Sequence, residues 1–237
     1  MTTTATISRT GEGAPTPLVI ERFLRDPESV WRQIAAEEHL GTLCRRMLVS
    51  SSVSMAIYGG VVGIAHSLPQ ALASALKLPV LFLLTLAICL PTLYLFNLVW
   101  GGRLSARQVL ALLLATITVT SALSLAFAPI TLFFLITAQS YPFFVLLNTA
   151  ILALTGGVGL SFLVEGTRFL NKQTEGGVRV NGALLYAWLL LYAFVGTQLG
   201  WTLRPFFGDP GQPFILFRAL EGNFYGGILD LIGALIR

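Results

Sequence analysis

Charged residues are scarce in this sequence. Asp, Glu, Lys and Arg make up 11% of its 237 residues, whereas they make up about 25% of a typical soluble domain. Hydrophobic residues account for 55%, and the mean hydropathy is +0.78. This composition excludes a soluble enzyme, a disordered chain and a small disulfide-rich domain. It predicts a polytopic membrane protein, built as an all-α transmembrane helical bundle.

Cysteine and histidine are also scarce, with two of each. Cys44 and Cys89 fall in apolar segments, where a thiol is mostly a small core residue, so we infer neither a disulfide nor a metal site. His39 and His66 lie near opposite ends of one apolar segment and cannot share a metal ion. The sequence has no phosphate loop, metal-ligand spacing or dinucleotide fingerprint. We therefore expect no enzymatic activity, no cofactor and no metal.

Long apolar runs dominate the rest of the chain. A hydrocarbon core of about 30 Å requires about 20 apolar residues in a helix, and five segments meet that requirement. They are residues 43–64, 79–100, 106–127, 143–164 and 183–203, and the third has an alternative end at Thr137, past Pro129. The bundle is expected over residues 43–205. Pro91 and Pro129 should kink their helices.

The N-terminal region precedes these spans. Residues 1–20 are predicted to be a flexible tail without a secretory signal. Residues 21–42 are predicted to be cytoplasmic and amphipathic, with a helix over Pro27–Leu40. Asp26 is the expected N-cap, and Pro27 and Glu28 suit the first turn. This helix lies either on the membrane surface or on the bundle.

The distribution of basic residues predicts an orientation. Positive charge concentrates in cytoplasmic loops, and with five spans eleven of the fifteen basic residues fall on the N-terminal side. Those eleven are Arg9, Arg22, Arg25, Arg32, Arg45, Arg46, Arg103, Arg107, Arg168, Lys172 and Arg179; the opposite four are Lys77, Arg204, Arg218 and Arg237. We therefore expect a cytoplasmic N-terminus and an external C-terminus. Because 13 of the 15 are Arg, as in GC-rich bacterial genomes, we expect a bacterial inner membrane.

The predicted spans contain no charge in their central parts. Proton-coupled transporters and pumps usually carry an ionisable group there, so its absence disfavours both classes. Asn97, Asn148 and Gln198 are the amides inside spans. They either bond between helices or line a polar path through the bundle, and Asn148 is the best candidate for the second role.

Two further features are candidate partner contacts. The first is the C-terminal region 206–237, predicted as an external loop and an interfacial or re-entrant helix, in which aromatic residues and Arg resemble the composition of interface hot spots. The second is a pair of glycines at helical spacing, which serves either packing within the bundle or contact with another subunit. The candidates are Trp201, Arg204, Phe206, Phe207, Asp209, Phe224, Tyr225, Gly59 and Gly63. Arg204 and Asp209 are able to pair within this loop. The alternative to a partner contact is a turn that only folds the tail back on the bundle.

Two stretches carry a resemblance to a known family. The segment Phe23–Ile34, which reads FLRDPESVWRQI, and the segment Gly101–Leu110, which reads GGRLSARQVL and is followed by Ala128-Pro129, resemble the Yip (Ypt-interacting protein) membrane family and its bacterial relatives. The resemblance covers roughly residues 20–205. It implies a five-span, non-enzymatic membrane scaffold or adaptor.

These observations favour an integral membrane scaffold or accessory subunit of a larger complex. Its expected partners are membrane lipids and other membrane protein subunits, among them a second copy of the chain, and not nucleic acid. The alternative is a passive channel or the permease subunit of a transporter, with the polar path through Asn97, Asn148 and Gln198.

Overall fold

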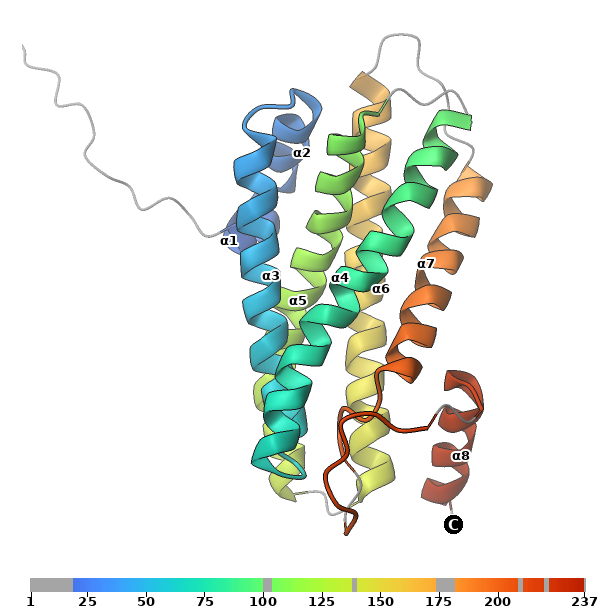
Figure 1. Cartoon of the computed structure of the whole chain (residues 1–237). Helices are drawn as coiled ribbons and strands as arrows, with labels where there is room; N and C mark the ends of the chain where they lie inside the picture. The colour runs from blue at the N-terminus through green and yellow to red at the C-terminus, as the bar shows by residue number, and fades with distance from the viewer. Residues whose placement is uncertain are drawn as a thin grey trace, which may run out of the picture.

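The computed structural model describes residues 19–99, 104–137, 140–173, 182–208, 211–219 and 222–236, and its regular elements in these ranges are helices. Five long helices lie side by side and alternate in direction, with short helices at both ends of the bundle (Figure 1). The helices are α1 (Val19–Arg25), α2 (Pro27–Ala35), α3 (Leu40–Gly63), α4 (Leu68–Val99), α5 (Ala106–Thr137), α6 (Tyr141–Gln173), α7 (Gly182–Thr202) and α8 (Phe224–Ile236). The all-α prediction is confirmed.

Three of the long helices have the length and composition of membrane spans. They are α4, α5 and α6, with 32, 32 and 33 residues. At about 1.5 Å per residue each is roughly 48 Å long, which exceeds the hydrocarbon thickness of a bilayer. The structure therefore suggests a membrane protein. The helices α3, with 24 residues, and α7, with 21, run alongside these three.

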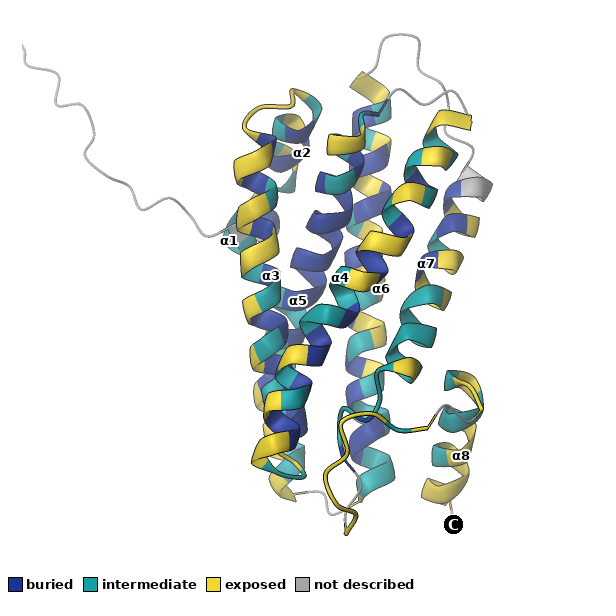
Figure 2. Ribbon diagram, in the orientation of Figure 1, coloured by how far each residue is buried: buried dark blue, intermediate teal, exposed yellow. Residues whose placement is uncertain are grey.

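Helix α5 is the centre of the bundle. Every residue from 111 to 121 is buried, including Leu112 and Leu113, because α3, α4 and α6 pack around it. Gly159 lets α6 approach closely, since a Cβ there would lie 2.7 Å from the carbonyl oxygen of Thr116. Figure 2 shows the continuous dark blue of α5 between its neighbours.

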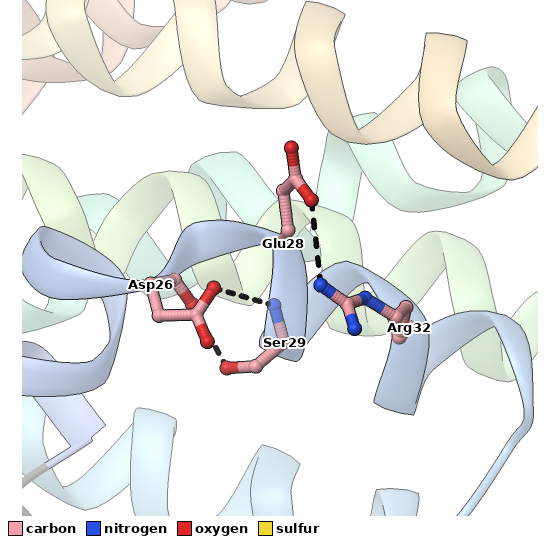
Figure 3. A network of polar contacts seen from close by, with 4 residues as sticks. All are labelled: Asp26, Glu28, Ser29 and Arg32. Carbon is pink, nitrogen blue, oxygen red and sulfur yellow. Dashed lines mark hydrogen bonds and ion pairs between the residues drawn. The ribbon is translucent and has the colours of Figure 1, made fainter.

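The start of α2 confirms the predicted cap. The backbone N–H of Ser29 donates to Oδ1 of Asp26 at 3.2 Å, Pro27 opens the helix, and Arg32 pairs with Glu28 at 3.4 Å (Figure 3). The short side chain of Asp26 thereby satisfies one of the unpaired N–H groups of the first turn.

The end of α2 differs from the prediction. The helix stops at Ala35, five residues before Leu40, and a turn over residues 36–39 leads directly into α3. Glu37 and His39 have positive φ angles of 54° and 50°, and a left-handed residue cannot continue a right-handed helix. The predicted helix over Pro27–Leu40 is therefore too long by its last five residues, of which Leu40 begins α3.

Of the two predicted positions for α2, the structure shows the one on the bundle. Val30, Trp31 and Ile34 are buried, and the ring of Trp31 packs against Phe162 of α6, with centroids 6.4 Å apart. The side chain of Gln108 in α5 donates to two carbonyl groups at the end of α2, those of residues 34 and 35. Helix α2 is therefore part of the protein core.

Three span boundaries extend beyond the predicted ones. Helix α4 begins at Leu68 rather than near Pro79, because Ser67 accepts the first free N–H groups, and Lys77 then lies inside the helix instead of in a loop. Helix α5 runs through Pro129 to Thr137, the longer alternative. Helix α6 extends nine residues past Val164.

Candidate functional site

The candidate site lies where the segment after α7 folds back against α4. Gln70, Ser74 and Lys77 are spaced three and four residues apart and therefore share one face of α4. The amide nitrogen of Gln70 donates to the carbonyl oxygen of Pro205 at 3.0 Å, and the hydroxyl of Ser74 donates to that of Phe206. Two of these three side chains thus bind the backbone of the segment.

Lys77 is the centre of this arrangement. Its side chain is 6% exposed, and its ammonium group donates to the carbonyl oxygens of Pro205, at 3.2 Å, and of Leu216. The same group lies 4.6 Å from the ring centroid of Phe217. A buried cation needs such acceptors, and an aromatic face stabilises it further. We call Gln70, Ser74 and Lys77 with their carbonyl acceptors the loop clamp.

Arg204 and Trp201 also hold the segment. The guanidinium of Arg204 stacks 3.6 Å from the ring centroid of Trp201, and it donates to the carbonyl oxygen of Ala219 at 2.9 Å. A Cβ at Gly227 would collide with the Trp201 ring, so only glycine lets α8 approach so closely. The predicted Arg204–Asp209 pair involves a residue outside the described ranges.

The other predicted loop aromatics point into the protein. Phe206 and Phe207 are half-buried, and Phe207 meets Phe144 of α6 edge to face at 6.0 Å. Gly208 has a φ of +67°, and a Cβ there would lie 2.5 Å from the His66 ring. These residues pack the tail against the bundle, and a partner contact at the half-buried Phe206 and Phe207 stays a prediction.

The exposed apolar residues of this region lie farther along the chain. Figure 2 shows residues 211–217 and much of α8 as exposed. We define the C-terminal surface as Phe214, Ile215, Leu216, Phe217 and Tyr225, whose exposure ranges from 38% to 58%. Of these five, the sequence prediction included only Tyr225. The run of four consecutive apolar residues after Pro213 is the sequence feature that could have indicated the other four. Phe224 is half-buried and packs against Tyr225.

Gly59 and Gly63 pack inside the chain. A Cβ at Gly59 would lie 2.8 Å from the carbonyl carbon of Ser74, and one at Gly63 would lie 2.6 Å from the carbonyl oxygen of Gln70. Both are buried between α3 and α4. They serve the first of their two predicted roles, helix packing within the bundle, and are not available to another subunit.

Asn148 bonds three helices together. Its carbonyl oxygen accepts hydrogen bonds from the hydroxyls of Tyr58 in α3 and Thr131 in α5, both at 2.9 Å. Its amide nitrogen donates to the carbonyl oxygen of Phe144, and the side chain is fully buried. The amide is thus used for bonding between helices.

The other two amides lie elsewhere. Asn97, near the end of α4, donates to the carbonyl oxygen of Leu104 at 3.2 Å, and Gln198 is half-buried on α7. Helix α4 ends and α6 begins at opposite ends of the bundle (Figure 1). Asn97 and Asn148 are therefore far apart along the bundle, and the structure does not bring the three amides together.

Among the described residues, no three His, Cys, Asp or Glu side chains gather closely enough for a metal site. His39 precedes α3 and His66 follows it, so the length of that helix separates them.

Comparisons with protein-family models, curated proteins and solved structures found no match to this chain.

Proposed function

We propose that the chain is a non-enzymatic integral membrane protein with five crossings, α3 to α7, that acts as a scaffold or accessory subunit of a larger membrane complex. The three long apolar helices support a membrane location. Helices α3 and α7 are about 36 and 31 Å long at the usual rise per residue, which is sufficient to cross a hydrocarbon core. The resemblance to the Yip family implies the same class, a non-enzymatic membrane scaffold.

The proposed orientation places the N-terminus in the cytoplasm, in a bacterial inner membrane. An odd number of crossings puts α2 and α8 on opposite sides, and the two helices lie at opposite ends of the bundle in Figure 1. The exposed Arg45 and Arg46 of α3 and the exposed Arg168 of α6 belong to the α2 end. Such an excess of positive charge is typical of the cytoplasmic face.

The C-terminal surface is the observation that carries the proposal. Hydrogen bonds from His66 to the carbonyl oxygen of Gln212 and from Lys77 to that of Leu216 fix the backbone on both sides of Phe214 and Ile215, so these side chains are presented without the entropy cost of ordering a free loop. Exposed aromatic and aliphatic groups on a rigid support are typical anchors of interfaces. The expected partner is a membrane protein subunit with a complementary apolar surface at this end.

Copurification tests the proposal. Tagged full-length chain, extracted from its native cells in a mild detergent, should retain a second membrane protein at a fixed stoichiometry. Truncating the anchors with Phe214→Ala and Ile215→Ala together should remove that protein. The matched control, Val49→Ala with Val53→Ala, alters two exposed apolar residues of α3 and should retain it. A chain that purifies as a solitary monomer contradicts the proposal.

A further inference from the structure

Helix α7 stops well before it reaches the level at which α4 begins. The two helices are antiparallel neighbours: the indole N–H of Trp188 donates to the hydroxyl of Thr92 at 3.2 Å, and a Cβ at Gly196 would lie 3.8 Å from the methyl group of Thr85. Because both helices rise by the same distance per residue, the last residue of α7, Thr202, is level with about Pro79 of α4. About eleven residues of α4, roughly 16 Å of helix, extend beyond it.

Helix α8 fills the remaining length. Its first turn lies beside the last turn of α7, because the hydroxyl of Tyr225 lies 3.3 Å from that of Thr197 and Gly227 packs on Trp201. From there its 13 residues extend about 20 Å, toward the end of the bundle at which α4 begins (Figure 1). Helices α7 and α8 together therefore extend over the same depth as α4, with α8 packed against α6 and α7.

An exposed charge on α3 marks one edge of the apolar belt, by which we mean the part of the bundle surface that would face lipid. Gly59 packs on Ser74 and Gly63 on Gln70, so the exposed Arg46 is level with about residue 87 of α4. From that level to the start of α4 is about 20 residues, or 30 Å, which equals the hydrocarbon thickness. Over the same depth α6 has no charged residue between Tyr141 and Val164. Helix α8 lies at the same level as the 11 to 12 residues of α4 that are nearest to its start.

The outward face of α4 at this level is strongly apolar. Leu68, Leu72 and Leu76 are spaced at four residues on one face and are each 67–70% exposed. The polar residues of the same segment, Ser74 and Lys77, face the loop instead. A helix in lipid is expected to point its apolar residues outward and its polar residues toward the protein, as α4 does here.

The loop clamp meets the requirement that hydrocarbon places on irregular backbone. Within a bilayer, an unpaired carbonyl group costs several kcal/mol, so non-helical backbone occurs only where protein groups satisfy it. Here Lys77, Ser74 and Gln70 donate to the carbonyl groups of residues 205, 206 and 216. A loop in water would need no such donors.

We propose that α8 is a re-entrant helix inside the external leaflet, and that its face with Leu229, Ile232 and Ile236 contacts lipid acyl chains. In this arrangement α7 and α8 make one interrupted crossing, and the clamp bonds the interruption to α4. Leu229 and Ile236, 69% and 81% exposed, enter the leaflet as α4's outward leucines do. The inference rests on the proposal that the bundle spans a membrane.

Spin labels in liposomes test the depth of α8. With Cys44→Ser and Cys89→Ala as the background, full-length chain receives one cysteine at a time, at Leu229, Ile232, Val53 or Gln212. Oxygen concentrates in hydrocarbon, whereas a nickel chelate stays in water. Labels at Leu229 and Ile232 should collide with oxygen at least severalfold more than with the chelate, as the label at Val53 of α3, which is 53% exposed and lies within the belt, should. The label at Gln212, which bonds His66 at the α3–α4 turn, should favour the chelate.

The controls separate the two proposals. If Leu229 and Ile232 favour the chelate while Val53 favours oxygen, the bundle crosses the membrane but α8 lies in water, and the inference is wrong. If Val53 also favours the chelate, the membrane proposal itself is wrong. All four positions are exposed or in a loop, and unchanged thermal unfolding of each variant verifies its fold.

Discussion

The two ends of the bundle each carry a short helix, and the two helices differ in what covers their apolar residues. At one end, α2 buries Val30, Trp31 and Ile34 against α5 and α6. At the other, α8 has no buried residue and exposes leucines and isoleucines along its length. One helix is thus covered by the protein itself, whereas the other leaves apolar side chains exposed that, under the proposals above, lipid or a partner covers.

The largest expected effect is the loss of stability from truncating α2. Trp31→Ala removes a buried ring from between Phe23, Phe162 and Gly166 and should lower the free energy of unfolding by about 3–5 kcal/mol. Leu229→Ala, on the exposed face of α8, should change it by less than about 0.5 kcal/mol in detergent. Unfolding titrations in micelles measure both. Equal losses would contradict the difference between the ends.

The interior near the α8 end provides a second test. Asn148→Leu leaves the hydroxyls of Tyr58 and Thr131 without their acceptor and should cost about 1–3 kcal/mol of unfolding free energy. Asn97→Leu, at a half-buried position with one hydrogen bond, should cost less. Liposome flux assays of the same variants test the transport alternative. Solute-specific flux in the wild type that Asn148→Leu abolishes would favour a channel over a scaffold.

Lys77→Met tests whether the loop clamp holds the loop at the α8 end. The variant removes two donors from the clamp, so the loop should open locally while the bundle stays folded. Limited proteolysis at residues 211–219 should accelerate severalfold, with little change in the thermal unfolding of the bundle. Lys172→Met, at an exposed position in the last turn of α6, is the matched control. An unchanged cleavage rate in Lys77→Met would mean that the clamp does not hold the loop.

The smallest expected effect concerns the cap of α2. Asp26→Ala removes the acceptor for the N–H of Ser29 and should cost about 1 kcal/mol. Asp26→Asn preserves an acceptor and should cost a few tenths at most. Replacing Asp230, exposed in the middle of α8, removes no such cap. A change at Asp230 as large as that of Asp26→Ala would show that α8 depends on its own charge rather than on its surroundings.

The sequence was most informative where a local rule decides the structure. Asp26 and Pro27 predicted the start of α2 because capping involves only neighbouring residues, and composition predicted the helical class. It was least informative at Lys77. A charged residue next to Pro79 is typical of a loop, and only the carbonyl groups of residues 205 and 216, more than 120 residues away, make its burial in α4 possible.

The candidate surface shows the same limit. Aromatic residues of a loop look alike in sequence whether they face a partner or the core, and here Phe206 and Phe207 turn inward while Phe214 and Phe217 stay exposed. Gly59 and Gly63 likewise suit two kinds of helix contact, and the nearness of α4 decides between them. Long-range contacts therefore choose among alternatives that local patterns leave open.

The sidedness of the two ends tests the central claim most directly. In the background without native cysteines, one cysteine replaces either Glu38, in the exposed turn before α3, or Gln212, in the loop after α7. A membrane-impermeant maleimide applied to intact cells should label Gln212→Cys at once, and should label Glu38→Cys only after the membrane is permeabilised. Labelling of both from the same side would contradict an odd number of crossings and, with it, the proposed five-span protein.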